Sequence, residues 1–163
     1  KAEKINTHGG SIRIYVKKDM KVKIDKSINK IIKEEIDYGI NKFKTYQNFG
    51  EKVYKIRENV IKNINQLKKK GTKIIGFGAP AKATTALNFF GISDQIDFIV
   101  EDNKLKHNKF IPGVKIPIVS KNKVNGKGDT ILVLAWNFFE DIKKNNKTLS
   151  DNFINIKSLE KEL

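Results

Sequence analysis

The sequence predicts an α/β domain, and three observations support this prediction. A short apolar strand runs into a glycine turn and then a helix at residues 73–82. Strand and helix patterns alternate from there onward, which is typical of a parallel, right-handed sheet. Residues 129–135 form a fully apolar run, as expected for a strand covered on both faces. Together they indicate a Rossmann-like, mostly parallel sheet with flanking helices.

The N-terminal part of the chain predicts one strand and two helices. Residues 12–17 alternate and are rich in β-branched side chains, which is typical of a strand. Ser27 is a suitable N-cap for a helix whose isoleucines recur at helical spacing, and a longer helix is expected over residues 48–70. We therefore expect residues 1–70 to form an N-terminal strand plus a long helical arm that belongs to the same domain as the core.

Residues 71–163 are expected to form the Rossmann-like core itself. The helix after the glycine turn runs to about Phe90 and stops at Gly91, because glycine readily adopts the left-handed conformation that ends helices. Another helix is expected after the apolar strand, to about Lys144. The other extended segments are predicted at residues 95–100, 115–119 and 152–156.

The net charge of +15 suggests nucleic-acid binding, but its make-up argues against it. Almost all of the positive charge is lysine, and Arg13 and Arg57 are the only arginines, whereas base readout and bidentate phosphate contacts favour arginine. We interpret the charge as a solvated surface and expect no nucleic-acid partner. The positive field can still attract a phosphorylated small molecule.

Composition also limits the chemistry and the location. The chain has no cysteine and only two histidines, so no metal site is expected. No apolar run approaches the roughly 20 residues of a membrane helix, and no signal-peptide pattern occurs, so we expect a cytoplasmic protein without a membrane partner. The chain begins at Lys1 rather than Met, which suggests a part of a longer polypeptide.

The glycine turn matches a phosphate-binding pattern. Gly76, Gly78 and Ala81 follow the spacing G-x-G-x-x-G/A after a strand, where glycines allow close approach of a phosphate and the next helix offers free N–H groups. Lys82 stands in the first helical turn, within reach of such a phosphate. The alternative is a tight strand-to-helix turn that binds nothing.

Other polar or aromatic residues follow later strands and should reach the same edge of the sheet, where ligands of open parallel sheets bind. Glu101 and Asp102 stand about where an acid that binds a ribose is expected. Trp136 and Asn137 are candidates for stacking and hydrogen bonding. Alternatively, Trp136 packs against the next helix and Asn137 caps it. Residues 104–113 form either a lid over this edge or an ordinary surface loop.

His8 lies beside a glycine pair in the N-terminal segment. A histidine near a flexible turn can act as a general acid or base, or it can hydrogen-bond a substrate. No carboxylate stands nearby in the sequence to orient it, so a structural role is the alternative.

Several motifs, in the same order, resemble the C-terminal domain of the S-adenosylmethionine-dependent sugar C-methyltransferases, which act on nucleotide-linked deoxy-keto-sugars. The resemblance covers about residues 5–145. The motifs are Thr7-His8-Gly9-Gly10-Ser11-Ile12-Arg13, Gly76-Phe77-Gly78-Ala79-Pro80-Ala81-Lys82, Leu87-Asn88-Phe89-Phe90-Gly91-Ile92, Glu101-Asp102-Asn103-Lys104-Leu105-Lys106, Ile111-Pro112-Gly113, Ile116-Pro117-Ile118 and Leu132-Val133-Leu134-Ala135-Trp136-Asn137-Phe138.

The resemblance implies a substrate-binding role for this chain. In that family the methyl donor and the catalytic base belong to segments upstream of the His-Gly-Gly-Ser motif, so we expect S-adenosylmethionine in an upstream methyltransferase domain of the same polypeptide and no cofactor here. No catalytic residue is expected in this chain beyond a supporting role for His8. The expected contacts to the nucleotide sugar are His8, Ser11, Arg13, Gly78, Ala79, Pro80, Ala81, Lys82, Asp102, Asn103, Trp136 and Asn137.

Two other functions stay open at this point. The glycine spacing by itself also fits an NAD(P)-binding module of an oxidoreductase. A Rossmann-like domain that binds no small ligand and serves only as an interaction surface is the second alternative.

Overall fold

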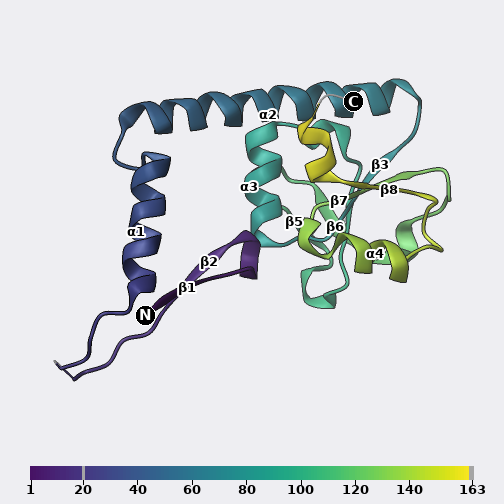
Figure 1. Ribbon diagram of the computed structural model, residues 1–163. Coiled ribbons are helices and arrows are strands. Elements are labelled where there is room, and N and C mark those ends of the chain that lie inside the picture. Colours follow the sequence, from purple (N-terminus) through teal and green to yellow (C-terminus); the bar gives the residue numbers. More distant parts are fainter. Residues whose placement is uncertain (20, 162–163) are drawn as a thin grey trace. The chain divides into compact units, whose positions relative to one another are not determined.

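The computed structural model describes residues 1–19 and 21–161 (Figure 1). The chain forms two compact units, Lys1–Val53 and Tyr54–Leu163. The boundary falls inside the long helix α2, Phe43–Lys69. The expected assignment of residues 1–70 to the same domain as the core stays a prediction.

The first unit contains an antiparallel hairpin and a helix. Strand β1, Ala2–Ile5, pairs with β2, Ser11–Ile14, and helix α1 follows at Lys26–Tyr38. The predicted strand is present, but its partner β1 was not predicted. Only four residues long, it has no clear apolar alternation.

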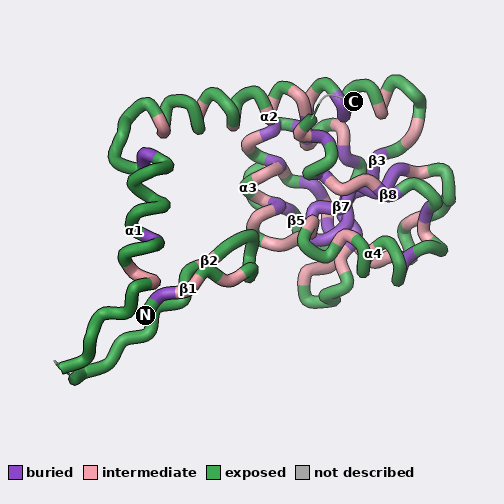
Figure 2. The backbone as a smooth tube through the Cα atoms, in the orientation of Figure 1, coloured by how far each residue is buried: buried purple, intermediate pink, exposed green. Residues whose placement is uncertain are grey.

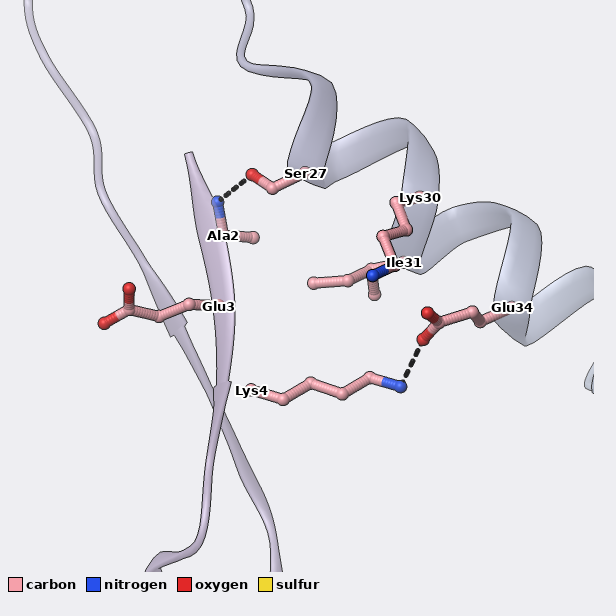
Figure 3. Close-up of a pocket in the computed structure, with 7 residues that line it drawn as sticks. All are labelled: Ala2, Glu3, Lys4, Ser27, Lys30, Ile31 and Glu34. Carbon is pink, nitrogen blue, oxygen red and sulfur yellow. Dashed lines mark hydrogen bonds and ion pairs between the residues drawn. The ribbon is translucent and has the colours of Figure 1, made fainter.

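Helix α1 packs on β1 through a few polar contacts and one buried isoleucine (Figure 3). The predicted N-cap Ser27 is wrong. Asp25 caps α1 by accepting the Ser27 N–H at 2.9 Å, and the Ser27 hydroxyl instead accepts the Ala2 N–H at 3.1 Å. The same surface carries an ion pair between Lys4 and Glu34. A carboxylate is an equally good cap, and Ser27 is one residue inside the helix.

The second unit is built on a six-stranded sheet with the order β5-β6-β4-β3-β7-β8. All neighbouring pairs are parallel except β5 with β6. From β3 the chain builds outward to β4 and β6 on one side, then crosses to β7 and β8 on the other. The strands are β3, Ile74–Phe77; β4, Ile99–Val100; β5, Lys109–Phe110; β6, Pro117–Val119; β7, Thr130–Val133; and β8, Asn152–Asn155.

Both faces of this sheet are covered, which confirms the predicted α/β fold. Helix α3, Ala81–Phe90, and the C-terminal half of α2 bury side chains such as Ile64 and Leu87 on one face. Helix α4, Phe139–Asn145, lies on the other face with Ile142. Figure 2 shows the buried residues concentrated in the strands between these helices. Helix α2 begins at Phe43 rather than at the predicted residue 48.

Helix α2 also holds the C-terminal segment. The side-chain amide of Asn63, which is 1% exposed, donates to the carbonyl oxygens of Leu159 at 3.0 Å and Lys161 at 2.8 Å. A buried amide needs such partners, so this contact holds residues 159–161 against the helix. Among residues 1–19 and 21–161, no helix has both the length and the apolar character needed to cross a membrane.

Candidate functional site

Strands β4 and β6 are added to one side of β3, and β7 and β8 to the other, so the strand order switches between β3 and β7. The carboxyl ends of β3 and β7 form the candidate site. Open α/β sheets bind ligands at such a switch point. Strand β3 leads into Gly78, whose φ of +87° favours glycine. A Cβ at this position would lie 2.9 Å from the Cβ of Ala135, which follows β7. The turn and the end of β7 are therefore in close contact.

Lys82 and Trp136 meet on the β7 side of the turn. The Lys82 Nζ lies 4.2 Å from the centroid of the Trp136 ring, a distance typical of cation–π contacts. Trp136 also packs against the core cluster on the α3 face. Lys82 forms no ion pair with any residue in the described ranges 1–19 and 21–161, so its charge remains available to an anion. Asn137 is exposed and does not cap α4, whose N-cap is Phe138.

The β4 side of the turn is closed by a glutamate. Oε2 of Glu101 accepts the Ala79 N–H at 2.9 Å and also accepts from Lys106 Nζ at 3.1 Å. Oε1 accepts the Asn103 N–H at 3.0 Å. Lys106 Nζ further donates to the Ala79 carbonyl at 3.0 Å. We call this set of contacts among Ala79, Glu101, Asn103 and Lys106 the Glu101 bridge.

The electrostatics of the Glu101 bridge favour a charged carboxylate. The Glu101 side chain is only 13% exposed. Burial by itself would raise its pKa, but the Asn103 and Ala79 N–H groups and Lys106 outweigh burial and lower the pKa below the usual value. The His107 ring nitrogen Nε2 lies 2.7 Å from the Glu101 carbonyl oxygen and helps to hold the backbone here.

The two neighbouring residues named from the sequence have local partners. The Asp102 carboxylate is 61% exposed and pairs with Lys121 Nζ at 2.7 Å. The Asn103 side chain accepts the Leu105 N–H at 3.0 Å and so caps a short 3-10 turn. Sequence reasoning named Glu101 as a ribose acid and assigned no role to Lys106, which it noted only as part of a motif. Nothing in the sequence distinguishes Lys106 from the other lysines of this loop.

The loop after β4 is fastened at several points along its length. Lys106 ties its start to the turn, and β5 pairs with β6. At its end the Asn88 amide of α3 donates to the Pro112 carbonyl at 3.0 Å. Gly113, with φ of +84°, lies so close that a Cβ would come within 2.2 Å of the Asn88 side-chain oxygen. The Asn88 and Pro112-Gly113 motifs thus contact each other and hold this loop on α3.

The remaining expected contacts belong to the first unit. His8 lies in a 3-10 turn, Thr7–Gly9, with φ of +54°, and its side chain is exposed. The Ser11 hydroxyl donates to the Thr7 carbonyl at 3.1 Å, and Arg13 Nη1 lies 3.2 Å from a Glu3 carboxylate oxygen. The binding roles of these three residues stay predictions.

Two comparisons with known proteins bear on this chain. Residues 6–155 match the family model of the C-methyltransferase C-terminal domain. The chain belongs to this family. It is also 30% identical over 152 residues to the C-methyltransferase NovU of Streptomyces niveus. That alignment covers 90% of this chain and 36% of NovU, so the chain spans about a third of the relative's length.

Proposed function

We propose that this chain is the part of a C-methyltransferase that binds a nucleoside-diphosphate-linked keto-deoxy-sugar, and that S-adenosylmethionine binds to an upstream domain. The observation that carries the proposal is Lys82 above the Trp136 ring at the switch point. A lysine in the first turn of a helix suits a diphosphate, because the helix end and the ammonium group attract the same charge.

The proposed roles follow from the chemistry of each group. The ammonium of Lys82 binds the diphosphate, and Trp136 holds the lysine in place and offers an apolar face to the base or the sugar. Asn137, exposed beside them, supplies an amide for sugar hydroxyl or keto groups. The deprotonation that precedes carbon methylation is assigned to residues outside this chain.

Binding experiments test this proposal. We expect calorimetric titration of the chain with UDP-glucose and dTDP-glucose to give saturable binding of at least one of them. Lys82→Ala should weaken that binding at least tenfold, because it removes the charge that meets the diphosphate. Lys104→Ala is the matched control: it removes an exposed lysine of the loop after β4.

The results separate the proposal from its alternatives. Equal weakening by both lysine substitutions would mean that only the general positive field attracts the nucleotide. Tight binding of NAD⁺ without binding of either sugar nucleotide would favour the oxidoreductase module. Methyl transfer by the chain alone would contradict the assignment of the donor site to an upstream domain.

A further inference from the structure

We propose that Glu101 determines ligand specificity at this edge: its carboxylate fills the position on the glycine turn that a dinucleotide pyrophosphate would take, and so directs a ligand's diphosphate to Lys82. The second part of this statement, that the diphosphate is directed to Lys82, rests on the proposed function. The exclusion of dinucleotides can be tested without it.

The N–H donor on the glycine turn already has an acceptor within the protein. In the dinucleotide pattern, N–H groups of the glycine turn face the pyrophosphate. Here the Ala79 N–H, directly after Gly78, donates to Glu101 Oε2 at 2.9 Å. A phosphate oxygen at that place would have to displace a carboxylate oxygen or lie against a like charge.

The Glu101 carboxylate is firmly held. Three donors, including the Lys106 ammonium group, converge on its two oxygens, and the side chain is 13% exposed. Lys106 also donates to the Ala79 carbonyl. The Lys106–Glu101 pair therefore binds both backbone polar groups of Ala79, its N–H and its carbonyl. Rotating Glu101 away would leave Lys106 and two N–H groups without this acceptor, which is costly for partly buried groups.

Lys106 and Lys82 differ in whether a carboxylate neutralises their charge. Lys106, on the β4 side, has its charge neutralised by Glu101, whereas Lys82, on the β7 side, contacts the Trp136 ring and no carboxylate within the described residues 1–19 and 21–161. Of these two lysines, therefore, Lys82 is the one that offers an incoming diphosphate an uncompensated charge. Like charges in contact are a recognised means of rejecting a wrong ligand.

Two variants test the exclusion by calorimetric titration of the chain with NAD⁺. Glu101→Gln removes the charge with little change in shape, and Glu101→Ala also empties the space. Both free Lys106 to meet a phosphate. We expect each to bind NAD⁺ at least tenfold more tightly than the unsubstituted chain, which corresponds to about 1.4 kcal/mol.

Asp94→Asn is the control, because it changes the net charge by the same amount at an exposed residue in the turn that precedes β4, away from the glycine turn. It should leave NAD⁺ binding within threefold of the starting value. Thermal unfolding confirms that each variant is folded. If Glu101→Ala does not fold, the result for Glu101→Gln decides the test.

The proposal is overturned if neither Glu101 variant gains affinity for NAD⁺, if Asp94→Asn gains as much, or if the unsubstituted chain already binds NAD⁺ at micromolar concentration. Failure of the proposed function would be seen in a different measurement: the unsubstituted chain would bind neither UDP-glucose nor dTDP-glucose. The two titrations therefore fail independently.

Discussion

Each side of the glycine turn holds a lysine, and the two lysines differ in whether a carboxylate neutralises their charge. On the β4 side a lysine and a glutamate neutralise each other and saturate the Ala79 N–H. On the β7 side Lys82 lies over an aromatic ring, which orients a cation without cancelling its charge. The comparison teaches that a glycine fingerprint predicts the shape of a turn, whereas the side chains around it decide which anion can enter.

The largest effect is expected at Gly78, where the two sides meet. Gly78→Ala should destabilise the fold by about 1–3 kcal/mol, because alanine is strained at a φ of +87° and its Cβ would crowd Ala135. Denaturant unfolding measures this. Gly126→Ala, with no neighbour within 4 Å of the added carbon, should stay within about 0.5 kcal/mol. Equal losses would show that the turn does not depend on this close contact.

A smaller effect is expected when the β4 side alone is opened. Lys106→Met should cost about 1 kcal/mol of stability, because it removes one partner of Glu101 while the lysine is partly exposed and its charge is screened. The exposed Lys104 in the same short turn offers a matched control, and Lys104→Met should change the unfolding free energy little. A stability loss no larger for Lys106→Met than for Lys104→Met would mean that the Glu101 bridge is not formed in solution.

The smallest effect is a pH dependence that sharpens the comparison. The pKa of Glu101 is lowered in the folded protein, so its stabilising contribution is complete above the unfolded value near 4.5 and is lost as pH falls through the lower folded value. The stability difference between the unsubstituted chain and Glu101→Gln should therefore be constant from pH 7 to about 5 and shrink below about 4.5. A difference that grows on acidification would contradict a lowered pKa.

The sequence was sufficient to predict five of the six strands of the second unit's sheet, because the buried strands are apolar runs and the turn has a distinctive glycine spacing. It did not reveal β1 or β5, which are only four and two residues long and rich in polar side chains. The contact of Asn63 with Leu159 joins positions 96 apart in the chain, beyond the reach of local patterns.

The same limit applies to the site. Lys82 and Trp136 were both named from the sequence, and topology brings them into contact because β3 and β7 are neighbours. The orientation of Glu101 could not be predicted, since an acid at that position can face either a ribose or the turn. The choice depends on Lys106, whose place is set by how the loop after β4 folds back.

The most direct test of this account is an NMR titration of the isotope-labelled chain with the sugar nucleotide that binds best. The account predicts chemical-shift changes at the Lys82 amide and the Trp136 indole N–H, with the Ala79 amide nearly unmoved because Glu101 still holds it. A large shift of the Ala79 amide while Lys82 and Trp136 remain unchanged would contradict it. The diphosphate would then bind on the β4 side of the turn.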